Sequence, residues 1–161
     1  MSMIGEFLQI SADDLEALIQ QPDSVLSYVF PEDGEFPDCL DVAKAWHGID
    51  YLLRGESYDG VGAGAAAKAV LGGTEIGDDK GYGPVRYLTV AGVKEVADAI
   101  SQIGREEFAQ RFDAQAMAKA GIYAFDLHDT DLEHFTHYYE ELKRYYEDAA
   151  KKGNAMLLFL T

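Results

Sequence analysis

Between residues 40 and 55, apolar side chains recur with the spacing of one face of an α-helix. That face would hold Val42, Ala45, Trp46, Ile49, Leu52 and Leu53. The opposite face carries polar and aromatic side chains, namely Lys44, His47, Tyr51 and Arg54, with Asp50 at its border. Asp41 is expected to cap the start of this helix, and Gly55 to take the left-handed turn after its end. The pattern therefore predicts a helix whose buried face holds the only Trp of the chain and whose opposite face carries a group of polar side chains.

Both ends of the chain are predicted to be β-strands. Residues 3–10 place Ile4, Leu8 and Ile10 on one side of such a strand. Residues 155–160 are apolar at every position, which is typical of a strand in the interior of a sheet. A third strand is expected at 85–88, and the Gly-rich stretches 56–64 and 74–84 are interpreted as loops.

Helices are predicted between these strands, at 11–20, 22–30, 65–71, 89–103, 105–112, 114–120 and 130–152. Ser11, Thr89 and Asp113 are expected to cap three of them through their side-chain oxygens. The chain as a whole, residues 1–161, is thus predicted to be a single α+β domain. Its small sheet would include the N-terminal and C-terminal strands and would be covered by several helices.

The longest predicted helix begins at a capping box formed by Thr130 and Glu133. Its buried stripe is expected to contain Leu132, Phe135, Tyr138, Tyr139, Leu142, Tyr145, Tyr146 and Ala149. On its outer face, the spacing predicts two weak ion pairs, Glu140–Arg144 and Glu147–Lys151.

The chain is strongly acidic, with a formal net charge of −16 over 161 residues. Residues 1–43 contain no Lys or Arg but ten acids: Glu6, Asp13, Asp14, Glu16, Asp23, Glu32, Asp33, Glu35, Asp38 and Asp41. Such a field repels phosphate backbones and anionic lipids, so we expect no nucleic-acid and no membrane partner. The charge either keeps the protein soluble or forms an acidic face for a basic protein partner.

The setting expected from the sequence is a bacterial-type cytoplasm. The single cysteine, Cys39, excludes an internal disulfide and suits a reducing compartment. The first residues lack the basic flank and apolar run of a signal peptide, and the longest apolar run, 155–160, is too short to cross a bilayer. Cys39, close to Asp38 and Asp41, is interpreted as a small buried thiol rather than a nucleophile.

Several short motifs along the chain occur together in a known order. They are Met-Ile-Gly-Glu-Phe at 3–7, Leu-Asp-x-x-Lys-x-Trp-His-Gly-Ile-x-Tyr-Leu-Leu-x-Gly at 40–55, Ala-Val-Leu-Gly-Gly at 69–73, Gly-Tyr-Gly-Pro-Val-Arg-Tyr-Leu-Thr at 81–89 and Ile-Tyr at 122–123. With the apolar strand at the C-terminus, they resemble the YfbM-like family of small bacterial proteins, a domain of unknown function. The resemblance spans essentially the whole chain and implies a single α+β domain, without an established activity.

A candidate ligand site combines His47, Asp50 and Tyr51 with Tyr82 and Arg86 from the second specific motif. Glycines around Tyr82 allow an unusual backbone close to a ligand, the Arg86 guanidinium can bind a carboxylate or phosphate, and His47 can titrate near neutral pH. In the structural alternative, Trp46 and Tyr87 are core residues, Asp50 and Arg54 form a surface pair, and His47 is simply solvated.

No metal site or cofactor is predicted. His128, His134 and His137 lie close to Asp131 and Glu133, but the stretch lacks the His-Glu-x-x-His spacing of zinc enzymes, and acids are ordinary in a first helical turn. The Gly-rich stretch 60–65 lacks the Lys-Ser/Thr ending of a phosphate loop. No Gly-x-Ser-x-Gly sequence is present, so the common serine-hydrolase arrangement is absent.

Two functional hypotheses follow. In the first, the protein is a non-catalytic binding protein, antidote-like or adaptor-like, that recognises a basic protein partner through its acidic surface. In the second, it is an enzyme acting on a small anionic ligand, with His47 as acid–base, Asp50 orienting it and Arg86 holding the anion. Both depend on whether the 40–55 helix and the 81–87 loop line one pocket.

Overall fold

The computed structural model describes residues 2–54, 64–123 and 129–161. In these residues, five strands form one antiparallel sheet in the order β2–β1–β5–β4–β3. The strands are β1 (Gly5–Ile10), β2 (Leu40–Asp41), β3 (Thr74–Ile76), β4 (Val85–Leu88) and β5 (Ala155–Leu160). The two predicted terminal strands therefore pair with each other, and β5 lies in the interior of the sheet, as its apolar sequence predicted.

The helices of the described residues are α1 (Ala12–Gln20), α2 (Val25–Val29), α3 (Trp46–Arg54), α4 (Val90–Ser101), α5 (Arg105–Gln110), α6 (Ala114–Lys119) and α7 (Asp129–Lys152). Three short 3₁₀ turns accompany them: η1 (Pro22–Ser24), η2 (Ala43–Ala45) and η3 (Gly64–Lys68). The predicted caps of α1, α4 and α6 are confirmed, since Ser11, Thr89 and Asp113 each accept a backbone N–H of the first turn. None of these helices, within the described ranges, has the length and apolar character needed to cross a bilayer.

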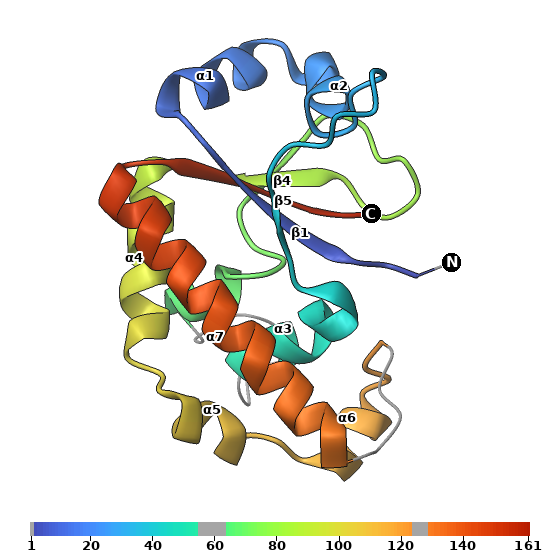
Figure 1. The fold of residues 1–161 in the computed structure, drawn as a ribbon, viewed down its shortest axis with the longest axis vertical. Helices are drawn as coiled ribbons and strands as arrows, with labels where there is room; N and C mark the ends of the chain where they lie inside the picture. The colour runs from blue at the N-terminus through green and yellow to red at the C-terminus, as the bar shows by residue number, and fades with distance from the viewer. Residues whose placement is uncertain (1, 55–63, 124–128) are drawn as a thin grey trace.

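The alternation of side chains along the strands divides the core into two clusters, one on each face of the sheet. Phe7 and Leu158 belong to the larger cluster, which is covered by α3, α4 and α7. Leu8 and Leu157 belong to the smaller cluster, which is covered by α1 and α2. Figure 1 shows these two groups of helices on opposite sides of the strands. The fold is α+β, as predicted.

The predicted helix over 40–55 is correct in its buried face but begins later than expected. Val42, Ala45, Trp46, Ile49, Leu52 and Leu53 are all buried. Leu40 and Asp41, however, pair with β1 as the short strand β2, because the edge of β1 offers them backbone partners. The Asp41 carboxylate accepts the Ala43 N–H at 2.6 Å, and Ala43 takes a left-handed φ of 51° where the strand turns into the helix. Gly55 lies outside the described residues.

Three further predictions about local structure need correction. Residues 74–76, predicted as loop, form strand β3, because they pair with β4. The short Ala-rich helix predicted over 65–71 is instead the 3₁₀ turn η3, which ends at Lys68. The longest helix begins at Asp129, one residue before the predicted cap, and the side chain of Thr130 lies outside what the structure describes. The Gly-rich connection 56–64 also falls outside the described residues, apart from Gly64.

Along α7, the predicted stripe faces the core, but the outer charges pair differently. Phe135, Tyr139, Leu142, Tyr146 and Ala149 are buried, and Leu132, Tyr138 and Tyr145 are partly buried. The ion pairs shown on this helix are Glu140–Lys143, Glu141–Arg144 and Asp148–Lys152. The expected Glu140–Arg144 pair is therefore replaced by two pairs at i,i+3, an equally close spacing on a helix.

Gly48 allows α3 to pack closely against α7. A Cβ atom at this position would overlap the ring of Phe135 on α7. Glycine in the middle of a helix ordinarily lowers stability relative to alanine. Its presence here is explained by the close approach of the two helices rather than by helix formation.

We expect Gly48→Ala to lower the free energy of unfolding by about 1–3 kcal/mol, because the gain in helix propensity is smaller than the cost of overpacking against Phe135. The matched control is Gly92→Ala in α4, where a Cβ would make ordinary contacts with Thr89 and Leu88. That variant should be as stable as the parent or gain up to about 1 kcal/mol. Urea denaturation measures both, and equal stabilisation of the two variants would contradict the close packing at Gly48.

Candidate functional site

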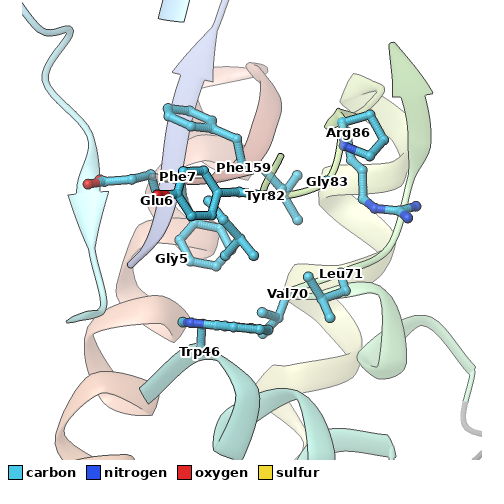
Figure 2. A pocket seen from close by; sticks show the side chains of 13 residues that line it. Gly5, Glu6, Phe7, Trp46, Val70, Leu71, Tyr82, Gly83, Arg86 and Phe159 are labelled. Carbon is cyan, nitrogen blue, oxygen red and sulfur yellow. The ribbon is translucent and has the colours of Figure 1, made fainter. Parts of the chain in front are cut away.

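A cleft of about 210 Å³ opens where strands β1, β4 and β5 meet the first turn of α3 (Figure 2). Its walls are mainly apolar and aromatic, with Phe7 and Leu158 from the sheet and Trp46 from α3. Tyr82 and Arg86, from the loop before β4 and from β4 itself, complete one side. The two segments that the sequence singled out, the tryptophan helix and the 81–87 stretch, therefore do meet at one cleft.

The loop that carries Tyr82 is held in shape by Asp79. One carboxylate oxygen of Asp79 accepts the N–H of Gly81 at 2.6 Å and that of Gly83 at 3.0 Å. Both glycines have positive φ, 107° and 89°, which side chains with a Cβ rarely adopt. This conformation places Tyr82 at the cleft, and Figure 2 shows it above the indole of Trp46.

Arg86 reaches the cleft already paired with an acid. Its Nη2 atom lies 2.8 Å from Oε1 of Glu75 on β3, and the two side chains are 28% and 61% exposed. Figure 2 shows the guanidinium directed away from Tyr82. The charge of Arg86 is thus balanced by a partner that is itself largely in solvent.

Glu6 also lines the cleft, and its carboxyl points away from Trp46 in Figure 2. Burial, and secondly the negative charge of Asp41, raise the pKa of Glu6 to about 7. Glu6 therefore keeps its proton to a higher pH than an ordinary glutamate, and it carries less negative charge near neutral pH than its sequence implies.

His47 has a structural partner away from the cleft. Its Nδ1 accepts the backbone N–H of Tyr123 at 2.8 Å, and its ring is stacked on Trp46 with centroids 5.0 Å apart. An accepting Nδ1 carries no proton, so the imidazole is neutral with its hydrogen on Nε2. Burial lowers the pKa of His47, although the nearby Asp50 charge acts in the opposite direction. His47 is neither simply solvated nor among the residues that line the cleft.

Trp46 and Tyr123 extend this contact to the N-terminal segment. The Trp46 indole N–H donates to the carbonyl of Met3 at 3.1 Å, and the N–H of Met3 donates to the Tyr123 hydroxyl at 2.8 Å. We call Met3, Trp46, His47 and Tyr123 the tryptophan junction. It joins three of the sequence motifs, and the role of Tyr123 in it was not predicted, although the Ile-Tyr motif at 122–123 marked the position.

Asp50 and Tyr51 do not reach the cleft either. Asp50 is buried rather than at a border, and its Oδ2 accepts Nε–H of Arg54 at 2.7 Å. Burial raises the pKa of Asp50 despite the opposing effect of Arg54. Tyr51 is half-buried against the larger core cluster. Of the five predicted ligand-site residues, the structure brings Tyr82 and Arg86 to the cleft, whereas His47, Asp50 and Tyr51 lie elsewhere on α3.

Within the described ranges, no group of three or more His, Cys, Asp or Glu side chains could hold a metal ion. His134 and His137 are exposed and contact the Tyr138 ring edge-on, with centroids 4.9 and 5.1 Å away. His128 and the Gly-rich stretch up to residue 63 lie outside the described residues. Burial and three nearby carboxylates raise the pKa of the half-buried Cys39 to about 12, so its thiol stays protonated.

These features define an α+β domain with an antiparallel five-stranded sheet and an aromatic cleft at one end of α3. The model of the family described as a domain of unknown function (DUF1877) matches residues 1–159, and the chain belongs to this family. The fold is similar to the crystal structure of YfbM from Escherichia coli, a protein of unknown function. The two are 20% identical, with a TM-score of 0.77 over 98% of this chain and 99% of that one. No curated protein matches the chain.

The tryptophan junction predicts a structural effect of His47. We expect His47→Ala to lower the free energy of unfolding at pH 7.5 by about 1–3 kcal/mol, because it leaves the Tyr123 amide without its acceptor. His47→Asn keeps an acceptor oxygen in the same position along the side chain and should recover part of this loss. Urea denaturation gives both values, and an unchanged stability of His47→Ala would contradict the junction.

The lowered pKa of His47 also determines how the stability of the folded protein changes with pH. As the pH falls through 6.5, the ordinary value, the unfolded chain takes up a proton at His47 before the folded chain does. The parent should therefore lose more stability than His47→Asn between pH 7.5 and pH 5.5.

The raised pKa of Glu6 predicts a pH dependence of stability with the opposite sign. Between its ordinary pKa of 4.5 and its folded value of about 7, the unfolded chain releases a proton that the folded chain keeps. Stability is therefore lost as the pH rises through this window, and Glu6→Gln should be more stable than the parent at pH 8 but similar to it at pH 4.5. Glu16→Gln, at an exposed acid on α1, controls for net charge. Denaturation at both pH values checks this, and identical profiles for the two variants would refute it.

Proposed function

We propose that this protein is a non-catalytic binding protein that recognises a basic, amphipathic segment of a partner protein. The recognition surface is the N-terminal lobe, which we define as residues 11–41, with α1, η1, α2 and β2. The observation that carries the proposal is the coincidence of exposed apolar side chains with unbalanced negative charge on this lobe.

Large hydrophobic side chains are exposed at three positions in the described residues, and all three lie in the N-terminal lobe. Phe36 is 67% exposed, Ile19 43% and Tyr28 37%. The lobe also carries nine exposed acids and no Lys or Arg; the acids are Asp13, Asp14, Glu16, Asp23, Glu32, Asp33, Glu35, Asp38 and Asp41. A segment with basic and apolar side chains complements both features, because opposite charges steer the encounter and apolar contacts supply affinity.

The enzymatic alternative has less support from the geometry. It requires His47, Asp50 and Arg86 around one small anionic substrate. The Nδ1 of His47 is occupied by the Tyr123 amide, the Asp50 carboxylate is paired with Arg54, and neither residue lines the cleft reached by Arg86. Among the described residues, His47 and Asp50 therefore do not share with Arg86 the cleft that it reaches, as acid–base catalysis there would require.

The test uses a labelled helical peptide of leucine and lysine with an apolar and a basic face, and a scrambled peptide of the same composition. We expect the double variant Ile19→Ser/Phe36→Ser to bind the amphipathic peptide roughly tenfold more weakly than the parent, because it loses apolar anchors of the interface. Its affinity for the scrambled peptide should be unchanged. Fluorescence anisotropy at low and moderate salt measures both affinities.

The charge part of the proposal has its own control. Glu16→Gln/Asp33→Asn removes two charges from the N-terminal lobe, and Asp98→Asn/Glu106→Gln removes two exposed charges elsewhere. We expect the first pair to weaken peptide binding more than the second. Equal effects of the two pairs, or no preference for the amphipathic peptide, would mean that net charge alone attracts the peptide, and the proposal would fail.

A further inference from the structure

We propose that the cleft beside Trp46 binds a small planar aromatic carboxylate, with its ring against the apolar walls and its carboxylate on Arg86. This ligand site is separate from the N-terminal lobe, so the proposal does not depend on the proposed function. It rests on the size of the cleft, on the order of side chains across the sheet and on the exposed partner of Arg86.

The size and lining of the cleft suit one aromatic ring. An apolar cavity of about 150 Å³ is large enough for benzene, so the volume of about 210 Å³ leaves room for a ring with a small substituent. Trp46, Phe7 and Tyr82 offer aromatic surfaces around it, and Val70 and Leu158 offer aliphatic ones. Stacked and edge-on contacts with such rings are favourable beyond simple burial.

The strand register orders apolar and charged groups in one row across the sheet. Phe7 is opposite Leu158, Leu158 is opposite Arg86, and Arg86 is opposite Glu75. Directly opposed residues point to the same face, and neighbouring strands lie about 4.8 Å apart. The Arg86 side chain is therefore the next neighbour of Leu158 along the row. Its guanidinium is turned toward Glu75 and away from Tyr82, so it has to turn back toward the cleft to meet the polar end of the ligand (Figure 2).

Glu75 is the internal partner of the Arg86 guanidinium, and a ligand carboxylate can replace it. Its side chain is 61% exposed, and exposed ion pairs contribute only about 0–1 kcal/mol. A ligand carboxylate can take its place at little cost, and it gains ring burial that Glu75 does not have. The net charge of −16 repels anions in general, so a preference for a carboxylate must arise locally at Arg86.

Benzoate and its uncharged isostere benzamide are suitable probes, and Trp46, the only Trp, reports on the cleft through its fluorescence. We expect the parent to bind benzoate more tightly than benzamide. Glu75→Gln, which removes the internal competitor, should raise benzoate affinity by about two- to fivefold and leave benzamide affinity unchanged. Arg86→Gln should abolish the preference for benzoate.

Two outcomes would overturn the proposal. The first is a Trp46 signal that neither probe changes in the parent or in Glu75→Gln; because Glu75 is exposed, this variant is expected to fold like the parent. The second is an equal gain in benzoate affinity for Glu75→Gln and for Glu106→Gln, a matched loss of one exposed charge far along the sequence. That result would assign the gain to overall charge and not to Arg86.

Discussion

The hydrogen bond from the Trp46 indole to the Met3 carbonyl is the constraint on which the cleft depends. It fixes the first turn of α3 against the segment that leads into β1, and Gly5 makes the approach possible, since a Cβ there would lie 2.6 Å from Cβ of Trp46. The ring also contacts the rings of His47 and Tyr123, with centroids 5.0 and 5.7 Å away. The indole is thus a fixed wall of the cleft, and the residues that hold it are spread over the whole sequence.

Two buried tyrosines of α7 hold neighbouring segments of the core through their hydroxyl groups. The buried Tyr146 hydroxyl donates to the Ala69 carbonyl at 2.6 Å, next to Val70 of the cleft. Tyr139 donates to the carbonyl of Ile103, two residues after the end of α4, at 2.7 Å. Both carbonyls lie outside the helices and strands, and a leucine in place of either tyrosine could not donate a hydrogen bond to them. The buried stripe on α7 follows the spacing of an apolar helix face, but the hydroxyl groups of its tyrosines also bind particular backbone carbonyls.

Features that depend on neighbouring residues could be predicted from the sequence, whereas features that depend on residues distant in the sequence could not. The buried face around Trp46, the caps at Ser11, Thr89 and Asp113, and the interior strand 155–160 depend on spacing within a few residues, and all are confirmed. The strands at 40–41 and 74–76 exist only because β1 and β4 offer them an edge. The hydrogen bond from the Tyr123 amide to His47 could not be predicted, because the two residues are 76 positions apart and no helical wheel can reveal such a partner. Tyr82 and Arg86 could be placed together because both belong to one short motif before and within β4.

The exposed Phe36 of the N-terminal lobe is connected to the cleft through a series of aromatic contacts. Phe159 of β5 lines the cleft, the ring of Phe30 meets it edge-on at 5.7 Å, and Phe36 meets Phe30 edge-on at 6.2 Å. Contacts of this kind contribute about 0.5–1.5 kcal/mol each beyond burial. The loop after α2 is therefore attached to the central strand of the sheet by its aromatic side chains. A side chain presented in this way needs little further ordering when a partner binds, and the free energy of the apolar contact is then available for recognition.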